Sequence, residues 1–155
     1  METPLRDQIK QSAPFGSLEQ EAFLNVLRTA AALEHAMTAR LKPYGLTLTQ
    51  YNVLRILRGA GPEGLCRNEV GARMLTPVPD ATRLLDRMVD AGLVVKQREG
   101  VDRRYVSTRI TERGLELLSA LDGPVAEMHR AQLGHLSQEE LRTLAHLLEA
   151  ARVCP

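Results

Sequence analysis

The chain has 155 residues, of which 44% are hydrophobic and 25% charged, so its length and composition suit one folded domain with a core. Its net charge is +1 at pH 7, but residues 40–110 carry 13 Lys and Arg against 7 Asp and Glu, whereas the remainder carries 7 against 12. There is no long apolar run and no secretory signal segment, and Cys66 and Cys154 form no paired motif, so we expect a reduced, cytoplasmic chain with no membrane partner.

The first long helix is expected over residues 18–41. Residues 1–16 contain Pro4, Pro14 and Gly16 and would form at most one short helix. Ser17 and Gln20 then have the spacing of a capping box, and Pro43 to Gly45 would end the helix that follows. Its apolar residues occupy more than one face, so we expect it to pack against both its own domain and a partner chain.

A second capping box, Thr47 and Gln50, predicts a core helix that ends near Gly59 to Pro62. Leu65 is expected to form a brief edge strand. A short helix from Cys66 to Leu75 would follow, with Val70 and Met74 directed inward. Gly71 lies inside this helix and should weaken it by roughly 1 kcal/mol unless a close backbone contact requires glycine.

The next helix is predicted over Thr76 to Ala91, with Leu75–Thr76 as a tight turn before it. Thr76 would be the N-cap, Pro77 the first helical residue, and Gly92 the left-handed residue after the end. Whether Pro79 shortens the helix is open. The inward stripe would contain Ala81, Leu84, Leu85, Met88 and Val89. The residues left on the outer face would be Asp80, Thr82, Arg83, Asp86 and Arg87.

Two strands, residues 93–97 and 105–110, are predicted after this helix, joined by a turn that contains Arg98, Arg103 and Arg104. Arginines in a turn are often only a solvated hairpin tip. A helix that presents Thr and Arg beside such a hairpin also suits duplex DNA, because a helix fits the major groove and an arginine fits the minor groove.

The C-terminal part is expected to be helical. Thr111 would cap a helix from Glu112 to about Leu136, with a kink or brief break at Asp122-Gly123-Pro124. Ser137 and Glu140 form a third capping box before the last helix. That last helix has an apolar stripe of Leu141, Leu144, Leu148 and Ala151. The first and last helices are apolar without visible partners in the chain, as expected in an obligate dimer.

Residues 45–114 resemble the winged helix-turn-helix of the MarR family, the multiple-antibiotic-resistance type of bacterial transcription regulator. The residues that carry the resemblance are Leu46-Thr47, Tyr51-Asn52-Val53-Leu54, Thr82-Arg83-Leu84-Leu85-Asp86-Arg87, Gly92-Leu93-Val94, Asp102-Arg103-Arg104 and Ile110-Thr111-Glu112-Arg113-Gly114. The resemblance implies one mainly α domain over residues 1–155 with a small β-hairpin wing. Residues 45–111 would form the DNA-binding lobe, and residues 1–42 and 112–155 the N- and C-terminal dimerisation helices.

The resemblance further implies a homodimer that binds double-stranded DNA at a palindromic operator, acts as a repressor and needs no cofactor. The second helix of the motif would lie in the major groove and the wing turn in the minor groove, with Asp102 bracing the wing. The expected DNA-binding residues are Thr76, Pro77, Pro79, Asp80, Thr82, Arg83, Arg87, Arg98, Arg103 and Arg104.

A small aromatic or phenolic effector is also implied by the resemblance, bound between the dimerisation helices and the DNA-binding lobe. The residues chemically suited to line such a pocket are Phe23, Leu27, His35, Tyr44, Tyr51, Arg55 and Met128. Simple packing is the alternative for each of them.

Cys66 stands where the family often has Ser or Thr at a helix N-cap. A thiolate there would be stabilised by the helix dipole, which makes a thiol-based redox sensor one alternative function. In the other interpretation the thiol only replaces a hydroxyl, since no neighbouring Cys is apparent to resolve an oxidised sulfur.

Catalysis is not expected. The sequence has no phosphate loop and no nucleophile elbow, and its histidines show no metal-ligand spacing. These histidines are His35, His129, His135 and His146. A winged helix that serves only as a protein-interaction module is the second alternative function, although such a module would not need Arg83, Arg87, Arg103 and Arg104 on one side.

Overall fold

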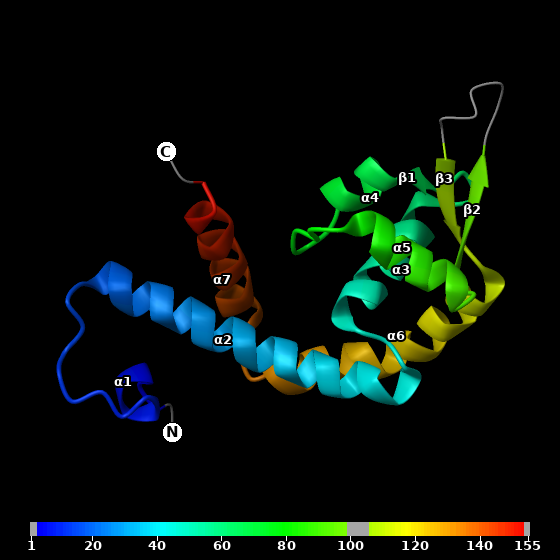
Figure 1. Cartoon of the computed structure of the whole chain (residues 1–155). Helices are drawn as coiled ribbons and strands as arrows, with labels where there is room; N and C mark the ends of the chain where they lie inside the picture. Colours follow the sequence, from blue (N-terminus) through cyan, green and yellow to red (C-terminus); the bar gives the residue numbers. More distant parts are fainter. Residues whose placement is uncertain (1–2, 99–105, 154–155) are drawn as a thin grey trace. The chain divides into compact units, whose positions relative to one another are not determined.

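The computed structural model describes residues 3–98 and 106–153. The chain divides into two compact units, Met1–Ala36 and Met37–Pro155, which are described separately. Figure 1 shows the chain as mostly helical, with a small antiparallel sheet in the second unit. No helix in the described part of the chain combines the length and apolar character needed to cross a membrane.

The first unit contains the short helix α1 (Leu5–Gln8) and most of α2 (Leu18–Leu41), so the predicted bounds of the long helix are confirmed. Ser17 caps α2, with its Oγ accepting from the Gln20 N–H at 3.2 Å. The Gln20 side chain accepts from the Gly16 N–H rather than from that of Ser17, so the box is one residue wider than expected. Within this unit α2 leaves large apolar side chains exposed: Leu18, Phe23, Val26 and Leu27.

The second unit is built around α3 (Leu48–Ala60) and α6 (Glu112–Leu133), which pack against each other. A short 3-10 helix (Lys42–Tyr44) and left-handed Gly45 precede α3, and the predicted Thr47–Gln50 capping box is present. The apolar side chains that lie in this core with almost no exposure include Leu54, Leu57, Leu118 and Leu121.

Of the kink or brief break expected at residues 122–124, the break is wrong, because α6 continues through Pro124. A proline removes one helical hydrogen bond, and here the flanking Leu121 and Val125 are both buried, so packing keeps the helix intact across it. The helix ends at Leu133 rather than near Leu136, and Gly134 follows as its C-cap.

Three strands form an antiparallel sheet in the order β1-β3-β2. They are β1 (Leu65–Cys66), β2 (Val94–Arg98) and β3 (Val106–Ile110). Leu65 pairs with Thr108 as the expected edge strand, and Val94 pairs with Ile110 across the hairpin. The sheet therefore has the arrangement expected for a wing. Strand β2 begins one residue later than predicted, whereas Tyr105, the predicted first residue of the second hairpin strand, lies outside the described residues.

Two helices before the hairpin differ from the prediction. The first, α4 (Arg67–Ala72), ends three residues earlier than expected, and the second, α5 (Ala81–Asp90), begins four residues after the expected first helical residue, Pro77. Thr76 is not the N-cap. Asp80 has that role, and its Oδ1 accepts from the Arg83 N–H at 2.9 Å. Because a residue before proline disfavours helical geometry, Thr76-Pro77 and Val78-Pro79 delay the start of the helix until both prolines are passed.

The last helix, α7 (Gln138–Ala151), begins with the predicted Ser137–Glu140 capping box. None of its described residues is buried. Its stripe of Leu141, Leu144 and Leu148 is half-buried or exposed, and Leu147 is exposed as well. The mainly α fold with a small wing sheet is confirmed, and α7 is left with an apolar face that its own unit does not cover.

Candidate nucleic-acid interface

The outer face of α5 carries the residues expected there. Leu85 and Met88 are buried, whereas Thr82, Arg83, Asp86 and Arg87 are exposed. The predicted inward stripe is therefore confirmed at its centre, with Ala81, Leu84 and Val89 half-buried beside it. A helix anchored on one side by Leu85 and Met88 presents two guanidinium groups to a partner on the other.

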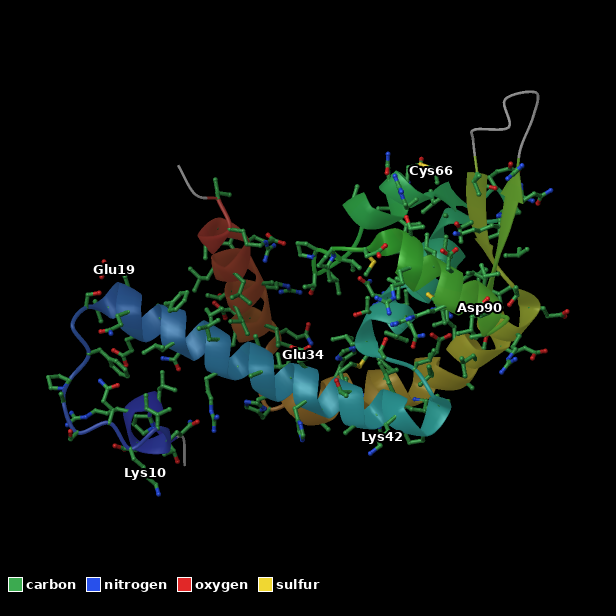
Figure 2. The ribbon with its side chains drawn as sticks, in the orientation of Figure 1. Lys10, Glu19, Glu34, Lys42, Cys66 and Asp90 are labelled. Atoms are coloured by element: carbon green, nitrogen blue, oxygen red, sulfur yellow. The ribbon has the colours of Figure 1, made fainter. Side chains whose placement is uncertain are left out.

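A groove of about 650 Å³ lies beside this face, between the start of α4, the start of α5 and the hairpin strands. It contains three cationic side chains: Arg67, Lys96 and Arg98. The other residues that line it are Cys66, Asn68, Thr82, Leu85, Val106 and Thr108. Figure 2 shows Cys66 beside α4, where this helix meets the sheet. The groove extends the positive charge of α5 toward the hairpin.

Two polar contacts connect α5 to the neighbouring elements. The Arg67 guanidinium, from α4, donates to Thr82 Oγ1 at 3.0 Å. Lys96, from β2, forms an ion pair with Asp86. Thr82 is therefore a hydrogen-bond acceptor for Arg67 as well as an exposed residue of α5, and Asp86 offsets part of the positive charge of Lys96.

Arg67 and Lys96 are absent from the set expected from sequence. Arg67 follows the predicted cap Cys66, and Lys96 lies within a predicted strand, so both elements were anticipated. The packing of α4 and β2 against α5, which places Arg67 and Lys96 beside that helix, could not be predicted from the sequence.

The other expected DNA-binding residues lie in two places. Thr76, Pro77 and Pro79 are exposed in the turn before α5, and Arg98 is exposed at the end of β2. Arg103 and Arg104, with the expected bracing residue Asp102, lie outside the described residues.

The residues expected to line an effector pocket are divided between the two units. Phe23, Leu27 and His35 belong to the first unit, where all three are exposed. In the second unit Tyr51 and Met128 are core residues, Tyr44 is half-buried and Arg55 is exposed. The cavity beside α5 and a shallow hollow around Phe15 are lined by other residues.

Tyr51 lies near a charged cluster on α3 and α6. Burial raises the pKa of its phenol, although the positive charge of Arg55 opposes that shift. Arg58 and Asp122 form a two-point ion pair between the helices, with both N–O distances at 2.9 Å. The hydrogen bonds from Arg58 hold the pKa of the Asp122 carboxyl below its ordinary value.

Cys66 is the expected N-cap of α4. Its thiol is half-buried at the groove, and its backbone N–H donates to Glu69 Oε2 at 2.7 Å. The cap is thus completed by a carboxylate three residues along the helix, whichever role the sulfur has.

The fold and the cationic face define a winged helix-turn-helix protein, in which α4 and α5 form the helical pair and β2 and β3 form the wing. The sequence model of the MarR family matches residues 44–104. A MarR transcription factor from Planctomyces limnophilus is 40% identical, with 88% of this chain and 99% of that one covered and a TM-score of 0.68. The chain belongs to the MarR family of transcription regulators.

Two further relatives extend the comparison. The regulator MhqR from Bacillus subtilis is 24% identical over 127 residues, which are 82% of this chain and 86% of the relative. A mutant MarR from E. coli, complexed with operator DNA, is 21% identical with a TM-score of 0.76, and the match covers 97% of this chain and all of that one. At that identity the latter similarity shows the fold alone.

Proposed function

We propose that this protein is a transcriptional repressor that binds operator DNA through the exposed face of α5 and the wing. The observation that carries the proposal is the cationic surface formed by Arg83 and Arg87 on α5 and by Arg67, Lys96 and Arg98 in the adjoining groove. Positive charge on a helix of the right size for a major groove favours phosphate contacts and base contacts together. The DNA complex formed by the related E. coli protein supports the same use of this fold.

The remaining expected DNA contacts belong to the same proposal. Thr76, Pro77, Pro79 and Asp80 would approach the backbone beside the major groove, and Thr82 would face base edges while it remains bonded to Arg67. Arg103 and Arg104 would reach the minor groove, with Asp102 bracing the wing.

The operator would be palindromic and the protein a homodimer. One chain is a single MarR-like domain, with residues 45–111 as the DNA-binding lobe and residues 1–42 and 112–155 as dimerisation helices. The exposed apolar residues on α2 and the absence of buried residues on α7 support this division, because a second chain could cover both faces.

Release from DNA would follow binding of a small aromatic or phenolic effector in the cytoplasm. Phe23, Leu27, His35, Tyr44, Tyr51, Arg55 and Met128 remain the proposed lining. Their apolar and aromatic surfaces would hold a ring, and Arg55 could pair with an acidic substituent.

A regulator of this type needs no catalysis, and its relatives are transcription regulators rather than enzymes. The competing function, a winged helix used only for protein docking, would not depend on the arginines of α5.

DNA selection separates these functions. The wild-type protein would be used to enrich duplexes from a randomised library, and the enriched duplex would be titrated against a scrambled duplex of equal length. We expect an inverted repeat that binds two chains. Failure to enrich any sequence, with equal binding of all duplexes, would contradict the proposed function.

A further inference from the structure

The segment that joins α4 to α5, residues 73–80, lacks two of its backbone hydrogen-bond donors. Pro77 and Pro79 have no backbone N–H, so neither can help to fix the turn. The segment begins with two local bonds, from Arg73 N–H to Val70 O and from Met74 N–H to Gly71 O. At its other end Asp80 caps α5, and between these ends contacts from other elements can fix the segment.

Asn52 supplies such a contact from α3. Its Oδ1 accepts from the Leu75 N–H at 2.9 Å, across 23 residues of sequence. Asn52 lies between Tyr51 and Val53, both buried in the core, so its backbone is held firmly. The amide side chain therefore ties the turn to a helix whose neighbouring residues are buried in the core.

The side chain of Leu75 does not contribute to this anchoring, because it is 82% exposed. The turn is thus held at this point by its backbone and not by apolar packing. A second tie lies beyond the prolines, where Arg67 of α4 donates to Thr82 of α5 at 3.0 Å. Together, the two contacts bracket the Pro77–Pro79 segment and set where α5 begins relative to α4.

We propose that Asn52 is a positioning residue for DNA recognition: it touches no DNA, but it fixes the turn and thereby the placement of Arg83 on α5. The inference rests on the proposed function, since positioning matters only if α5 reads DNA. A displaced α5 would still carry the same charge, so attraction to phosphates would persist while contacts with base edges would be lost. Loss of Asn52 should therefore reduce sequence discrimination more than overall affinity.

The experiment compares Asn52→Ala with Asn52→Asp, which keeps an oxygen acceptor at the same position. Asn25→Ala is the matched control, because the Asn25 amide donates to Glu21 O within its own helix, α2. Each variant is titrated with the duplex enriched by wild type and with its scrambled partner, at equal salt. Amide hydrogen exchange at Leu75 is measured in parallel without DNA, so that the hydrogen bond is tested separately from its consequence.

We expect Asn52→Ala to lose protection at the Leu75 amide and to lower the ratio of enriched to scrambled affinity by about tenfold, which corresponds to the loss of one hydrogen bond. Asn52→Asp should keep both the protection and the ratio, and Asn25→Ala should match wild type. A folded Asn52→Ala that retains the wild-type ratio would overturn the proposal while leaving the proposed function intact. If that variant does not fold, a lowered ratio in Asn52→Asp with Leu75 still protected would overturn it instead. Wild type without any preference between the duplexes would overturn both.

Discussion

Arg58 and Asp122 connect α3 to α6 through two parallel hydrogen bonds, each 2.9 Å long, from the guanidinium to the carboxylate. The two side chains are 35% and 53% exposed, so solvent screens the pair. Its contribution to the free energy of unfolding should therefore be small, roughly 0.5–1 kcal/mol. We expect Asp122→Asn to destabilise the protein by this amount at neutral pH, measured by urea unfolding.

The effect of Asp122→Asn should depend on pH. Arg58 lowers the pKa of the Asp122 carboxyl in the folded state, so the stabilisation is present above the ordinary aspartate pKa and is lost as pH falls through the lowered one. The difference between wild type and variant should disappear in strong acid. Glu127→Gln, an exposed carboxylate on the same helix, is the control and should show little effect. A pH-independent loss in Asp122→Asn would mean that packing rather than charge is responsible.

Two glycines in helices should respond in opposite directions to alanine. A Cβ at Gly114 would lie 2.5 Å from Leu93 O and 2.7 Å from Ile110 Cγ1, whereas a Cβ at Gly71 would meet nothing within 4 Å. Gly114→Ala should destabilise by about 1–3 kcal/mol through overpacking. Gly71→Ala should stabilise by about 0.5–1 kcal/mol, because alanine favours a helix. Urea unfolding of both variants measures this, and a Gly71→Ala variant less stable than wild type would show that glycine is required there.

Helix starts that depend on contacts between residues close in sequence were predictable. The Thr47–Gln50 and Ser137–Glu140 capping boxes are contacts between residues three apart, so the spacing alone placed the starts of α3 and α7. The start of α5 was not placed correctly, because Thr76 and Asp80 are both good caps. The residue before a proline disfavours helical geometry, and Thr76 and Val78 both precede prolines, so the helix starts at the later cap.

The outer face of α5 was also predictable, because apolar residues such as Leu85 and Met88 recur at helical spacing and mark the buried side. The groove beside it was not. The contacts of Arg67 with Thr82 and of Asn52 with Leu75 join residues 15 and 23 positions apart, and they depend on how separate helices pack. Sequence periodicity says which side of a helix is buried, but not which neighbour covers it.

The role of Cys66 can be tested with an oxidant. We expect Cys66→Ser to bind the enriched duplex as wild type does, with or without peroxide, because Glu69 completes the cap of α4 and serine can replace the thiol there. Duplex titrations of both proteins before and after peroxide treatment provide the measurement. Peroxide-induced loss of binding in wild type, absent from Cys66→Ser, would instead establish the thiol as a redox sensor.

Assembly should depend on the apolar face of α7. Leu144→Asp combined with Leu148→Asp should give a folded monomer that no longer binds the operator, because two buried carboxylates would oppose association. Thr143→Asp combined with His146→Asp adds the same two charges on the other side of the helix and should leave the dimer unchanged. Sedimentation of the three proteins at micromolar concentration gives the result. A folded Leu144→Asp, Leu148→Asp protein that remains dimeric would place the interface elsewhere.

The salt dependence of DNA binding by Arg83→Ala shows whether the exposed face of α5 binds DNA. Arg130→Ala removes the same charge from an exposed position on α6 and serves as the control. On the enriched duplex, Arg83→Ala should weaken binding by about 1–3 kcal/mol, relax sequence preference and reduce the slope of log affinity against log salt by about one for each chain bound. Arg130→Ala should follow wild type. An Arg83→Ala protein with wild-type affinity, preference and slope would contradict the account.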